Sequence, residues 1–435
     1  MRALERVLPE LLLAGLISCL TANCQVPGVG SQAGDPNAGP RVSKPETPRP
    51  DAHPSPESRI PSPDLLKARW HVLGARPLGL FYYASDSRGL KSLETHAPQM
   101  TLLGPQCFWV DEQGIVHGEL PPQVVEIARQ ANLPIMPLVI NPGFDRAMAR
   151  TLLRNPQAQE RAAAYLAYLA HRDNYVGWQL DLEYIDPADR DRYSRFVAKV
   201  AARLHRDHRL LSVALVPRFS DRYPDPPAPL GRQPSHSANE FRTGEWGAPY
   251  DFRAVGRAAD FVTLMTYDHH GESDPPGPVA GYEWVEAAVR YAVARIPRSK
   301  LLLGIPFYGR EWVLPSAPGE TFKTRNLAFP DAQELLGRPG TASHWDDRWR
   351  TGWFEYRDAS GQHTGWYEDS KSLAAKLQVM RRYQLRGFAA WRLGEEDPKF
   401  WVLQAPALRS GPQNARSGAG ARPAPTARPN DARLP

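Results

Sequence analysis

The stretch VGWQLDLEYIDP, Val176 to Pro187, places acidic groups in a run that otherwise has the composition of a buried β-strand. Valine, tryptophan, leucine and tyrosine favour strands, yet Gln179, Asp181 and Glu183 recur at every second position. Because successive side chains of a strand point to opposite faces, these polar groups share one face and the intervening leucines share the other. Unpaired buried acids are costly, so this face indicates a functional site more than a salt-bridged edge.

Similar apolar runs recur along the chain and alternate with amphipathic helical stretches. Strands are expected within residues 78–85, 99–110, 133–141, 175–185, 210–218, 260–268, 300–309 and 386–394, and helices at 157–172, 189–207 and 281–296. Eight strands alternating with helices are the pattern of an α/β protein of the (β/α)8 TIM barrel type. The alternative is an open doubly wound sheet, but no glycine-rich phosphate turn follows the first expected strand.

In such a barrel the three polar side chains point inward and rise toward the C-terminal ends of the strands, where catalytic groups of this fold gather. Glu183 is the uppermost of them. Further residues at or near expected strand ends are candidates to line a substrate groove, namely Tyr82, Trp109, Asn141, Arg218 and Tyr308. For each of these five, packing or a position in a solvent-facing loop is an equally open alternative.

Four motifs occur in order across nearly the whole expected body: GWQLDLE (177–183), LMTYD (264–268), LLLGIPFYGRE (301–311) and GFAAWRLGEEDP (387–398). Together they resemble four signatures of the family 18 glycoside hydrolases, the chitinase-like barrels. These are Asp-Gly-x-Asp-x-Asp-x-Glu, Met-x-Tyr-Asp, Gly-x-Pro-x-Tyr-Gly, and an eighth strand that ends in tryptophan. The pattern is nearest to bacterial spore-cortex and peptidoglycan-directed members, which tolerate an amide at the position of Gln179.

The resemblance implies retaining hydrolysis of β-linked N-acetylglucosamine polymers, in which the sugar's own 2-acetamido oxygen replaces a protein nucleophile. Glu183 would be the general acid and then the base, Asp181 would orient the acetamide and stabilise the oxazolinium ion, and Tyr267 would bond the acetamido oxygen. Trp391 would be the apolar floor beneath the sugar, although taken alone it also fits a core position. The same motifs add substrate contacts at Asp268, Met265 and Gln179. No cofactor is implied.

The spacing of Asp181 and Glu183 predicts their protonation states independently of the family resemblance. Carboxyl groups two residues apart on one strand face lie within about 7 Å at the backbone, so in a low-dielectric cleft one ionises less readily than the other. This keeps Glu183 protonated near neutral pH, as a general acid requires. Val176 and Gln179 stand where the family usually has two aspartates. We expect the Gln179 amide to donate to Asp181, which would then stay ionised over a wider pH range than usual.

Residues 311–370 are too many for a simple crossover and are predicted to form an insertion between the seventh and eighth strands. Aromatic runs on either side of DASG (358–361) indicate a β-hairpin. We assign five aromatic residues of this segment to a small subdomain core: Trp345, Trp349, Trp353, Trp366 and Tyr367. The alternative is that they stack on sugars beyond the cleavage point. The histidines lack ligand spacing, so no metal site is indicated.

The two ends of the chain differ in composition from the middle. Residues 1–19 resemble a secretory signal that ends in LISC, a bacterial lipobox pattern, which predicts export to the envelope with a lipid on Cys19; plain secretion is the alternative. Residues 20–65 are rich in proline, glycine and serine, and residues 409–435 in proline, alanine and arginine. Both are predicted to be disordered around a folded body at 66–408.

Charge and cysteine content exclude other classes. The tail 409–435 holds five arginines against one aspartate, which accounts for four of the six formal positive charges, so nucleic acid is not an expected partner. With Cys19 lipidated, only Cys24 and Cys107 would remain as thiols in the mature chain, so no disulfide framework supports the fold.

Three function classes remain. The first is an anchored glycosidase that acts on peptidoglycan, chitin or an exopolysaccharide. The second is a lectin-like glycan binder, which in this family typically arises by loss of the glutamate found here as Glu183. The third is a tethered structural protein whose basic tail meets anionic envelope polymer. Because Glu183 is present and the tail explains nothing about the strands, we favour the glycosidase.

Overall fold

The computed structural model describes residues 62–75, 77–221, 246–315 and 320–403. The predicted signal segment with Cys19, the predicted linker as far as residue 61, and the predicted basic tail at 409–435 lie outside these residues. Within the described part of the chain, no helix combines the length and the apolar character needed to cross a bilayer.

Helix α2 (Pro63–Gly74) begins three residues before the predicted start of the folded body at residue 66. Its N-cap is Ser62, whose side chain accepts a hydrogen bond from the backbone N–H of Leu65 over 3.1 Å. A serine cap followed by proline is a favoured helix start. The predicted linker therefore extends too far, because a proline-rich linker and a helix that begins with proline look alike in composition.

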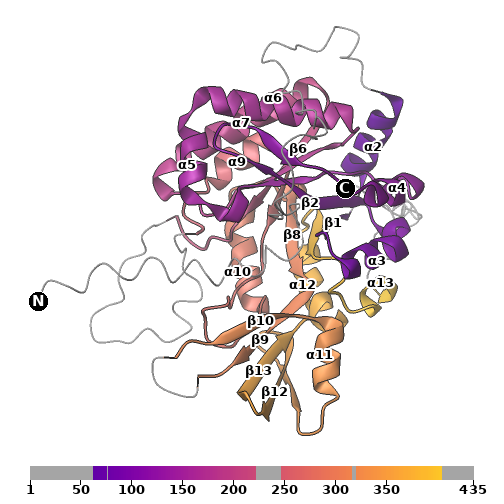
Figure 1. The fold of residues 1–435 in the computed structure, drawn as a ribbon, viewed down its shortest axis with the longest axis vertical. Coiled ribbons are helices and arrows are strands. Elements are labelled where there is room, and N and C mark those ends of the chain that lie inside the picture. The colour runs from indigo at the N-terminus through magenta and orange to yellow at the C-terminus, as the bar shows by residue number, and fades with distance from the viewer. Residues whose placement is uncertain (1–61, 76, 222–245, 316–319, 404–435) are drawn as a thin grey trace, which may run out of the picture.

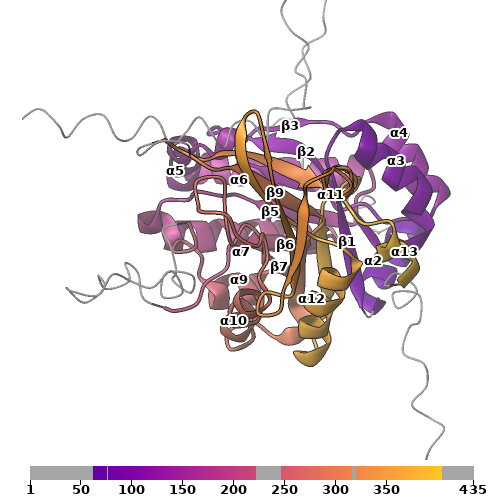
Figure 2. The same cartoon turned by 90° about the horizontal axis from the view of Figure 1, so that it is seen from below.

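Eight parallel strands of the described chain close into a barrel, with helices outside it (Figure 1; Figure 2). In order around the barrel they are β1 (Leu78–Tyr83), β2 (Leu102–Val110), β4 (Leu138–Ile140), β5 (Gly177–Asp181), β6 (Leu210–Leu215), β7 (Phe261–Leu264), β8 (Leu301–Pro306) and β14 (Gly387–Trp391). β1 pairs with both β2 and β14, which closes the sheet and excludes the open-sheet alternative. Each strand lies within one of the eight expected runs, so the (β/α)8 prediction is confirmed.

Helices follow the strands and form the outer layer. They are α3 (Ser87–His96), α4 (Pro122–Gln130), α5 (Arg146–Arg154), α6 (Pro156–Arg172), α7 (Arg190–Arg206), α9 (Phe252–Ala258), α10 (Tyr282–Val293) and α12 (Ser370–Arg382). The expected helices at 157–172, 189–207 and 281–296 correspond to α6, α7 and α10. The short strand β3 (Val116–Gly118) folds back antiparallel onto β2, and 3-10 turns lie at Ala97–Gln99, Pro142–Phe144, Pro187–Asp189 and Arg298–Lys300.

The alternation of side chains along β5 separates the outside of the barrel from its inside. Trp178 and Leu180 belong to the apolar cluster between strands and helices, and the Trp178 indole donates to the carbonyl of Leu166 in α6 over 2.8 Å. Gln179 points the other way and donates to the hydroxyl of Thr263 on β7 over 3.0 Å. The predicted pattern of inward polar and outward apolar residues is therefore confirmed.

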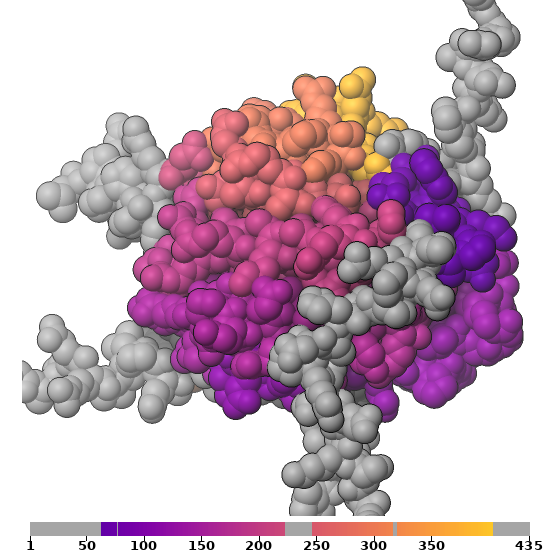
Figure 3. Space-filling view, turned by 90° about the horizontal axis from the view of Figure 1, so that it is seen from above, coloured from indigo at the N-terminus to yellow at the C-terminus, as the bar shows by residue number. Residues whose placement is uncertain are grey.

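The last helix of the described residues, α13 (Lys399–Leu403), packs next to α3. The ring of Trp401 stacks on that of His96 with centroids 4.3 Å apart. In the space-filling view, the indigo early residues and the yellow late residues lie on the same side of the molecule (Figure 3). This contact joins the first and last units of the barrel.

The insertion between β8 and α12 is a five-stranded antiparallel sheet with one helix, and it lies at the bottom of Figure 1. Its elements are β9 (Tyr308–Val313), β10 (Lys323–Ala328), α11 (Phe329–Leu336), β11 (Ala342–Asp346), β12 (Thr351–Asp358) and β13 (Gly361–Tyr367). β12 and β13 form the predicted hairpin around DASG. The insertion begins at residue 308 rather than the predicted 311, because β9 follows β8 after a single residue.

The aromatic residues of the insertion divide between its own apolar cluster and the main core of the protein. Trp349, Trp366 and Tyr367 are buried, and Trp353 stacks on Trp366 with ring centroids 5.8 Å apart. The predicted subdomain core is confirmed for Tyr367, which clusters with Leu335 and Phe354 of the insertion. Trp349 and Trp366 instead join the main apolar cluster, with Trp353 packed against it, and the ring of Trp349 is edge-on to that of His269, with centroids 5.2 Å apart. The ring of Trp345 instead lies against the ammonium group of Lys371, 3.4 Å from the ring centroid.

Candidate active site

Asp181 and Glu183, here called the acid pair, stand at the C-terminal end of β5, with only 5% and 8% of their surfaces exposed. Burial raises the pKa of Asp181 to about 7. Burial also raises the pKa of Glu183 well above its usual value, and the negative charges of Asp181 and Asp268 raise it further. Glu183, whose pKa is raised by burial and by two neighbouring charges, is therefore the expected holder of the proton that the acid pair retains.

Gln179 does not bond to Asp181 as the sequence predicts. Its amide nitrogen donates to the hydroxyls of Ser212 and Thr263, over 3.1 and 3.0 Å. Among the described residues, neither the Gln179 carbonyl oxygen nor Asp181 Oδ1 has a hydrogen-bond partner. A buried carboxylate without a hydrogen-bond donor loses the stabilisation that water gave its charge, and nothing in the protein replaces it. Burial raises the pKa of Asp181 to about 7, and the expected comparison with an aspartate at position 179 stays a prediction.

The segment after β7 brings a second group of predicted residues to the acid pair. Asp268, in the left-handed region with φ of 58°, accepts hydrogen bonds from the Tyr308 hydroxyl over 2.6 Å and from the Arg310 guanidinium over 3.1 Å. The ring of Tyr267 is edge-on to that of Tyr308, with centroids 6.4 Å apart. Burial, and then the charges of neighbours that include both members of the acid pair, raise the pKa of Tyr267. The phenol therefore lies within electrostatic reach of the pair.

Trp391 ends β14 with part of its surface exposed. Its ring packs against Tyr82 of β1, with centroids 5.3 Å apart, and the Tyr82 hydroxyl donates to Thr263 Oγ1 over 3.3 Å. Only 1% of the surface of Tyr82 is exposed. The predicted groove-lining role of Tyr82 is therefore corrected to support of Trp391 inside the barrel.

Asn141 follows β4 and holds the backbone of Glu183. Its Nδ2 donates to the Glu183 carbonyl over 2.9 Å, and its Oδ1 accepts from the Glu183 N–H over 2.8 Å. The side chain has no exposed surface. Both ends of the amide are in use, so the predicted sugar contact of Asn141 is wrong and the residue instead fixes the main chain beneath the acid.

Arg218 and Tyr308 also differ from their predicted roles. Arg218 is fully buried, and its Nη1 donates to the carbonyls of Ala248 and Tyr250 over 3.0 Å each. Tyr308 is buried with its hydroxyl committed to Asp268. At a strand end the backbone leaves the sheet and its carbonyls need new donors. Polar side chains at such positions therefore serve the fold here, and neither residue is placed to line a groove.

Two further predicted contacts lie at strand ends near the mouth. Trp109 of β2 is partly buried and its ring stacks on that of His117 in β3, with centroids 5.6 Å apart. Met265 directly follows β7 and is buried in the same apolar cluster as Tyr267. Their contact with a sugar stays a prediction.

Trp246 is a residue that the sequence interpretation missed. Its indole Nε1 donates to Glu183 Oε2 over 2.9 Å, and its ring stacks on that of Tyr184, with centroids 5.9 Å apart. Nearby, the Tyr250 hydroxyl donates to the Leu182 carbonyl over 2.8 Å. Both aromatic residues stand in the short turn segment 246–251 that precedes α9, where no periodicity draws attention to them.

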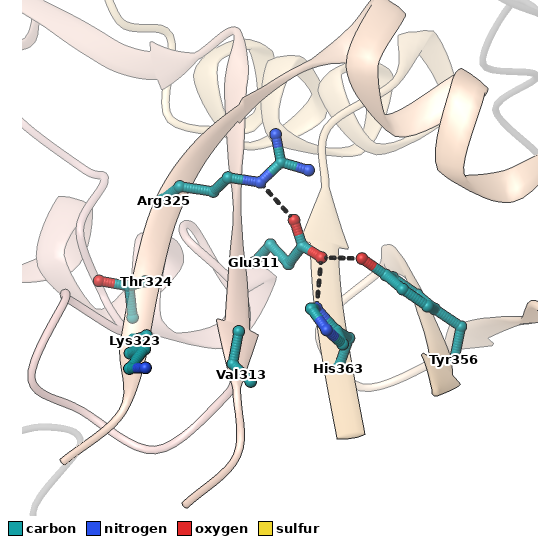
Figure 4. A pocket seen from close by; sticks show the side chains of 7 residues that line it. All are labelled: Glu311, Val313, Lys323, Thr324, Arg325, Tyr356 and His363. Carbon is teal, nitrogen blue, oxygen red and sulfur yellow. Dashed lines mark hydrogen bonds and ion pairs between the residues drawn. The ribbon is translucent and has the colours of Figure 1, made fainter. Parts of the chain in front are cut away.

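A pocket on the insertion is lined by side chains of β9, β10, β12 and β13 (Figure 4). At its base the buried carboxylate of Glu311 accepts hydrogen bonds from Arg325 Nε, His363 Nδ1 and the Tyr356 hydroxyl, over 2.6, 2.8 and 2.5 Å. Successive residues of β9 point to opposite faces, so Glu311 faces away from Arg310 and the acid pair. Across the described residues, no group of three or more histidine, cysteine, aspartate or glutamate side chains is arranged to hold a metal ion.

Comparison with known proteins agrees with this geometry. A model of the family "Glycosyl hydrolases family 18" matches residues 126–396. The uncharacterized glycosylase YvbX of Bacillus subtilis is 26% identical over 326 residues, which cover 74% of this chain and 88% of the relative. The cortical fragment-lytic enzyme of the same organism is 27% identical over 311 residues, which cover 71% and 68%.

Two solved structures are also similar. The spore cortex-lytic enzyme SleL of Bacillus megaterium superposes with a TM-score of 0.66 at 29% identity, covering 76% of this chain and 73% of that chain. A chitinase of Chromobacterium violaceum gives a TM-score of 0.65 at 28% identity, covering 75% and 97%.

Proposed function

The chain belongs to glycosyl hydrolase family 18 and is a glycoside hydrolase of glycans that contain N-acetylglucosamine, and from this premise we propose a retaining, substrate-assisted mechanism with Glu183 as the acid and base. The support for this proposal is the geometry of the acid pair at the barrel mouth, with Tyr267 in electrostatic reach and Trp391 partly exposed at the end of β14. No cofactor takes part in the proposed reaction.

In the first step Glu183 donates its proton to the glycosidic oxygen while the bond from that oxygen to the anomeric carbon breaks. The 2-acetamido oxygen forms a new bond to the anomeric carbon and gives an oxazolinium ion. The ionised Asp181 accepts the acetamido N–H and stabilises the positive charge. Tyr267 donates to the acetamido oxygen, and Trp391 packs against the sugar ring.

In the second step the Glu183 carboxylate takes a proton from water, and the water oxygen opens the oxazolinium ring from the face that the leaving group occupied. The configuration of the anomeric carbon is thereby retained. One group acts in both steps, so its proton has to be held in the resting enzyme and released during turnover. The raised pKa of Glu183 fits the first requirement.

We propose peptidoglycan as the polymer, because relatives of this chain are named for lysis of the spore cortex. Chitin is the second candidate, favoured by the similarity to the Chromobacterium chitinase. Export with a lipid on Cys19, which we retain as part of this proposal, would bring the enzyme to the bacterial envelope where peptidoglycan lies.

The anomer released first tests the mechanism. We expect a soluble N-acetylglucosamine oligomer to yield the β-anomer before mutarotation, as followed by proton NMR, since retention preserves the β-linkage. The matched glucosamine oligomer is the control and should be inert, because it lacks the acetyl oxygen that attacks. Release of the α-anomer, or faster cleavage of the glucosamine oligomer, would contradict substrate assistance. Binding of the oligomer without turnover would instead favour the lectin-like alternative.

Replacing Gln179 with aspartate tests the electrostatics of the pair. A third carboxyl group in the buried barrel interior is expected to raise the pKa of Asp181 further, so the acidic limb of kcat/KM should move to higher pH. The measurement is a pH–rate profile on the N-acetylglucosamine oligomer. Gln179→Leu removes the same two hydrogen bonds without adding charge and is the matched control. Superimposable profiles for the two variants would argue against this coupling.

A further inference from the structure

We propose that Trp246 is a positioning residue that decides which oxygen of Glu183 carries the catalytic proton. Its indole N–H holds Oε2 as a hydrogen-bond acceptor, and the proton is thereby placed on Oε1, from which it passes to the leaving oxygen. This inference rests on the proposed role of Glu183 as general acid and base.

The hydrogen-bond roles at Glu183 follow from the chemistry of the two groups. The indole nitrogen of Trp246 lies 2.9 Å from Oε2 and can only donate. A neutral carboxyl group has one carbonyl oxygen and one hydroxyl oxygen, and the carbonyl oxygen is the better acceptor. The indole therefore selects Oε2 as the carbonyl oxygen. Within the described part of the chain, Oε1 is left without a donor of this kind, which suits the oxygen that meets the substrate.

The main chain on both sides of this hydrogen bond is held in place. Asn141 bonds to the N–H and the carbonyl of Glu183, and the Tyr250 hydroxyl bonds to the carbonyl of Leu182. Arg218 binds the carbonyl of Tyr250 and so fixes the segment that follows Trp246. Because acid and indole are anchored separately, the bond between them needs little ordering during catalysis.

The electrostatics around Glu183 give the indole a second effect. Burial raises the pKa of Glu183, the carboxylates of Asp181 and Asp268 raise it further, and the Trp246 N–H lowers it. Among the described residues, the charge of Glu183 also acts on four phenols, whose pKa values are raised first by burial and then by neighbouring charges: Tyr184, Tyr193, Tyr250 and Tyr267. The indole therefore favours the carboxylate that forms as the proton leaves.

A different role for Trp246 is stacking on a sugar. One face of its ring is already covered by Tyr184, and the edge that carries Nε1 is turned to Glu183. A stacking role predicts equal losses for all substrates that occupy the same sugar site. A role through the acid predicts losses only where the leaving group needs a proton.

Trp246→Phe separates these roles, because phenylalanine keeps an aromatic ring but has no N–H. The assay compares kcat/KM on an N-acetylglucosamine oligomer with that on the same oligomer carrying a 4-nitrophenyl leaving group, which departs with little protonation. We expect about a 10- to 100-fold loss on the first substrate, from the free-energy range of hydrogen bonds to charged groups, and little loss on the second. The basic limb of the pH profile should also move to higher pH, because a donor to the carboxylate is gone.

The ratio of the two kcat/KM values is measured in one preparation, so it does not depend on the fraction of folded enzyme. Trp70→Phe, at an exposed position of α2, is the matched control and should leave the ratio unchanged. Trp246→His retains a ring with a donor and should recover part of the lost activity on the unsubstituted oligomer.

Equal losses on both substrates with an unshifted pH profile, or no loss on either, would overturn the assignment. Failure of the wild-type enzyme to cleave either substrate would refute the proposed function instead, so the two failures are distinguishable.

Discussion

Replacing Glu183 with glutamine is expected to lower kcat/KM on N-acetylglucosamine oligomers by about 100- to 10,000-fold, the range that general acid–base catalysis contributes. Glutamine has nearly the same shape, but it can neither give a proton to the leaving oxygen nor take one from water. Both steps of the proposed reaction lose their proton carrier. The measurement is the initial rate of oligomer cleavage, together with the affinity of the intact oligomer determined by calorimetry.

The affinity for the oligomer should change little in Glu183→Gln. Asn141 bonds to the main chain of residue 183 and not to its side chain, so the substitution leaves the backbone of the site in place. Glu395→Gln is a matched control, since Glu395 is equally exposed at 8% and burial raises its pKa to about 7, yet it takes no part in the proposed reaction. Turnover by Glu183→Gln at the level of the Glu395→Gln control would remove Glu183 from the mechanism.

Much of this fold was predictable because strands and helices leave different periods in a sequence. The eight barrel strands each lie in an apolar run of the expected length, and β5 shows the two-residue alternation directly. The start of α2 was missed because its prolines resemble those of the preceding linker. A capping serine before a proline is a local signal, and it was outweighed by composition averaged over a longer window.

The orientation of the site residues on β5 was predictable from that strand alone. The hydrogen-bond partners of the other site residues were not, because they come from neighbouring segments. Alternation along β5 indicates that Asp181 and Glu183 face inward, whatever surrounds them. Strand ends identified Asn141 and Arg218 as candidates, but the partner of a polar side chain depends on which carbonyls the next segments leave open. Those segments show no strand or helix periodicity, so a position at a strand end alone suggested sugar contacts. In the structure the two side chains instead hold backbone carbonyls.

The partners of Gln179 depend on the same kind of information. Gln179 and Asp181 are neighbours on one strand face, which suggests that they bond to each other. In the barrel, β6 and β7 bring the hydroxyls of Ser212 and Thr263 nearer to the amide. Which of several inward groups bond is a property of the strand register between neighbours, and that register is set by the whole barrel.

Replacing Asp181 with asparagine is expected to lower kcat/KM by about 100- to 1,000-fold, the cost of removing one group that stabilises charge in a transition state. Asparagine has the shape of the protonated aspartate and carries no charge to offset the oxazolinium ion. Because the pKa of Asp181 is about 7, wild-type activity should rise as the pH increases through neutrality. The variant should lack this rise, and its remaining activity should be flat across the same interval, as measured by a pH–rate profile.

The same substitution is expected to stabilise the fold above neutral pH. The pKa of Asp181 rises from 3.8 to about 7 on burial, so between these values the unfolded chain ionises first and folding stability falls as the pH rises. This cost is complete above pH 7 and is absent in Asp181→Asn. The melting temperature of the variant should therefore exceed that of the wild type above pH 7, and the difference should shrink toward pH 3.8. A variant that loses activity and also melts earlier above pH 7 would show that Asp181 supports the fold rather than the reaction.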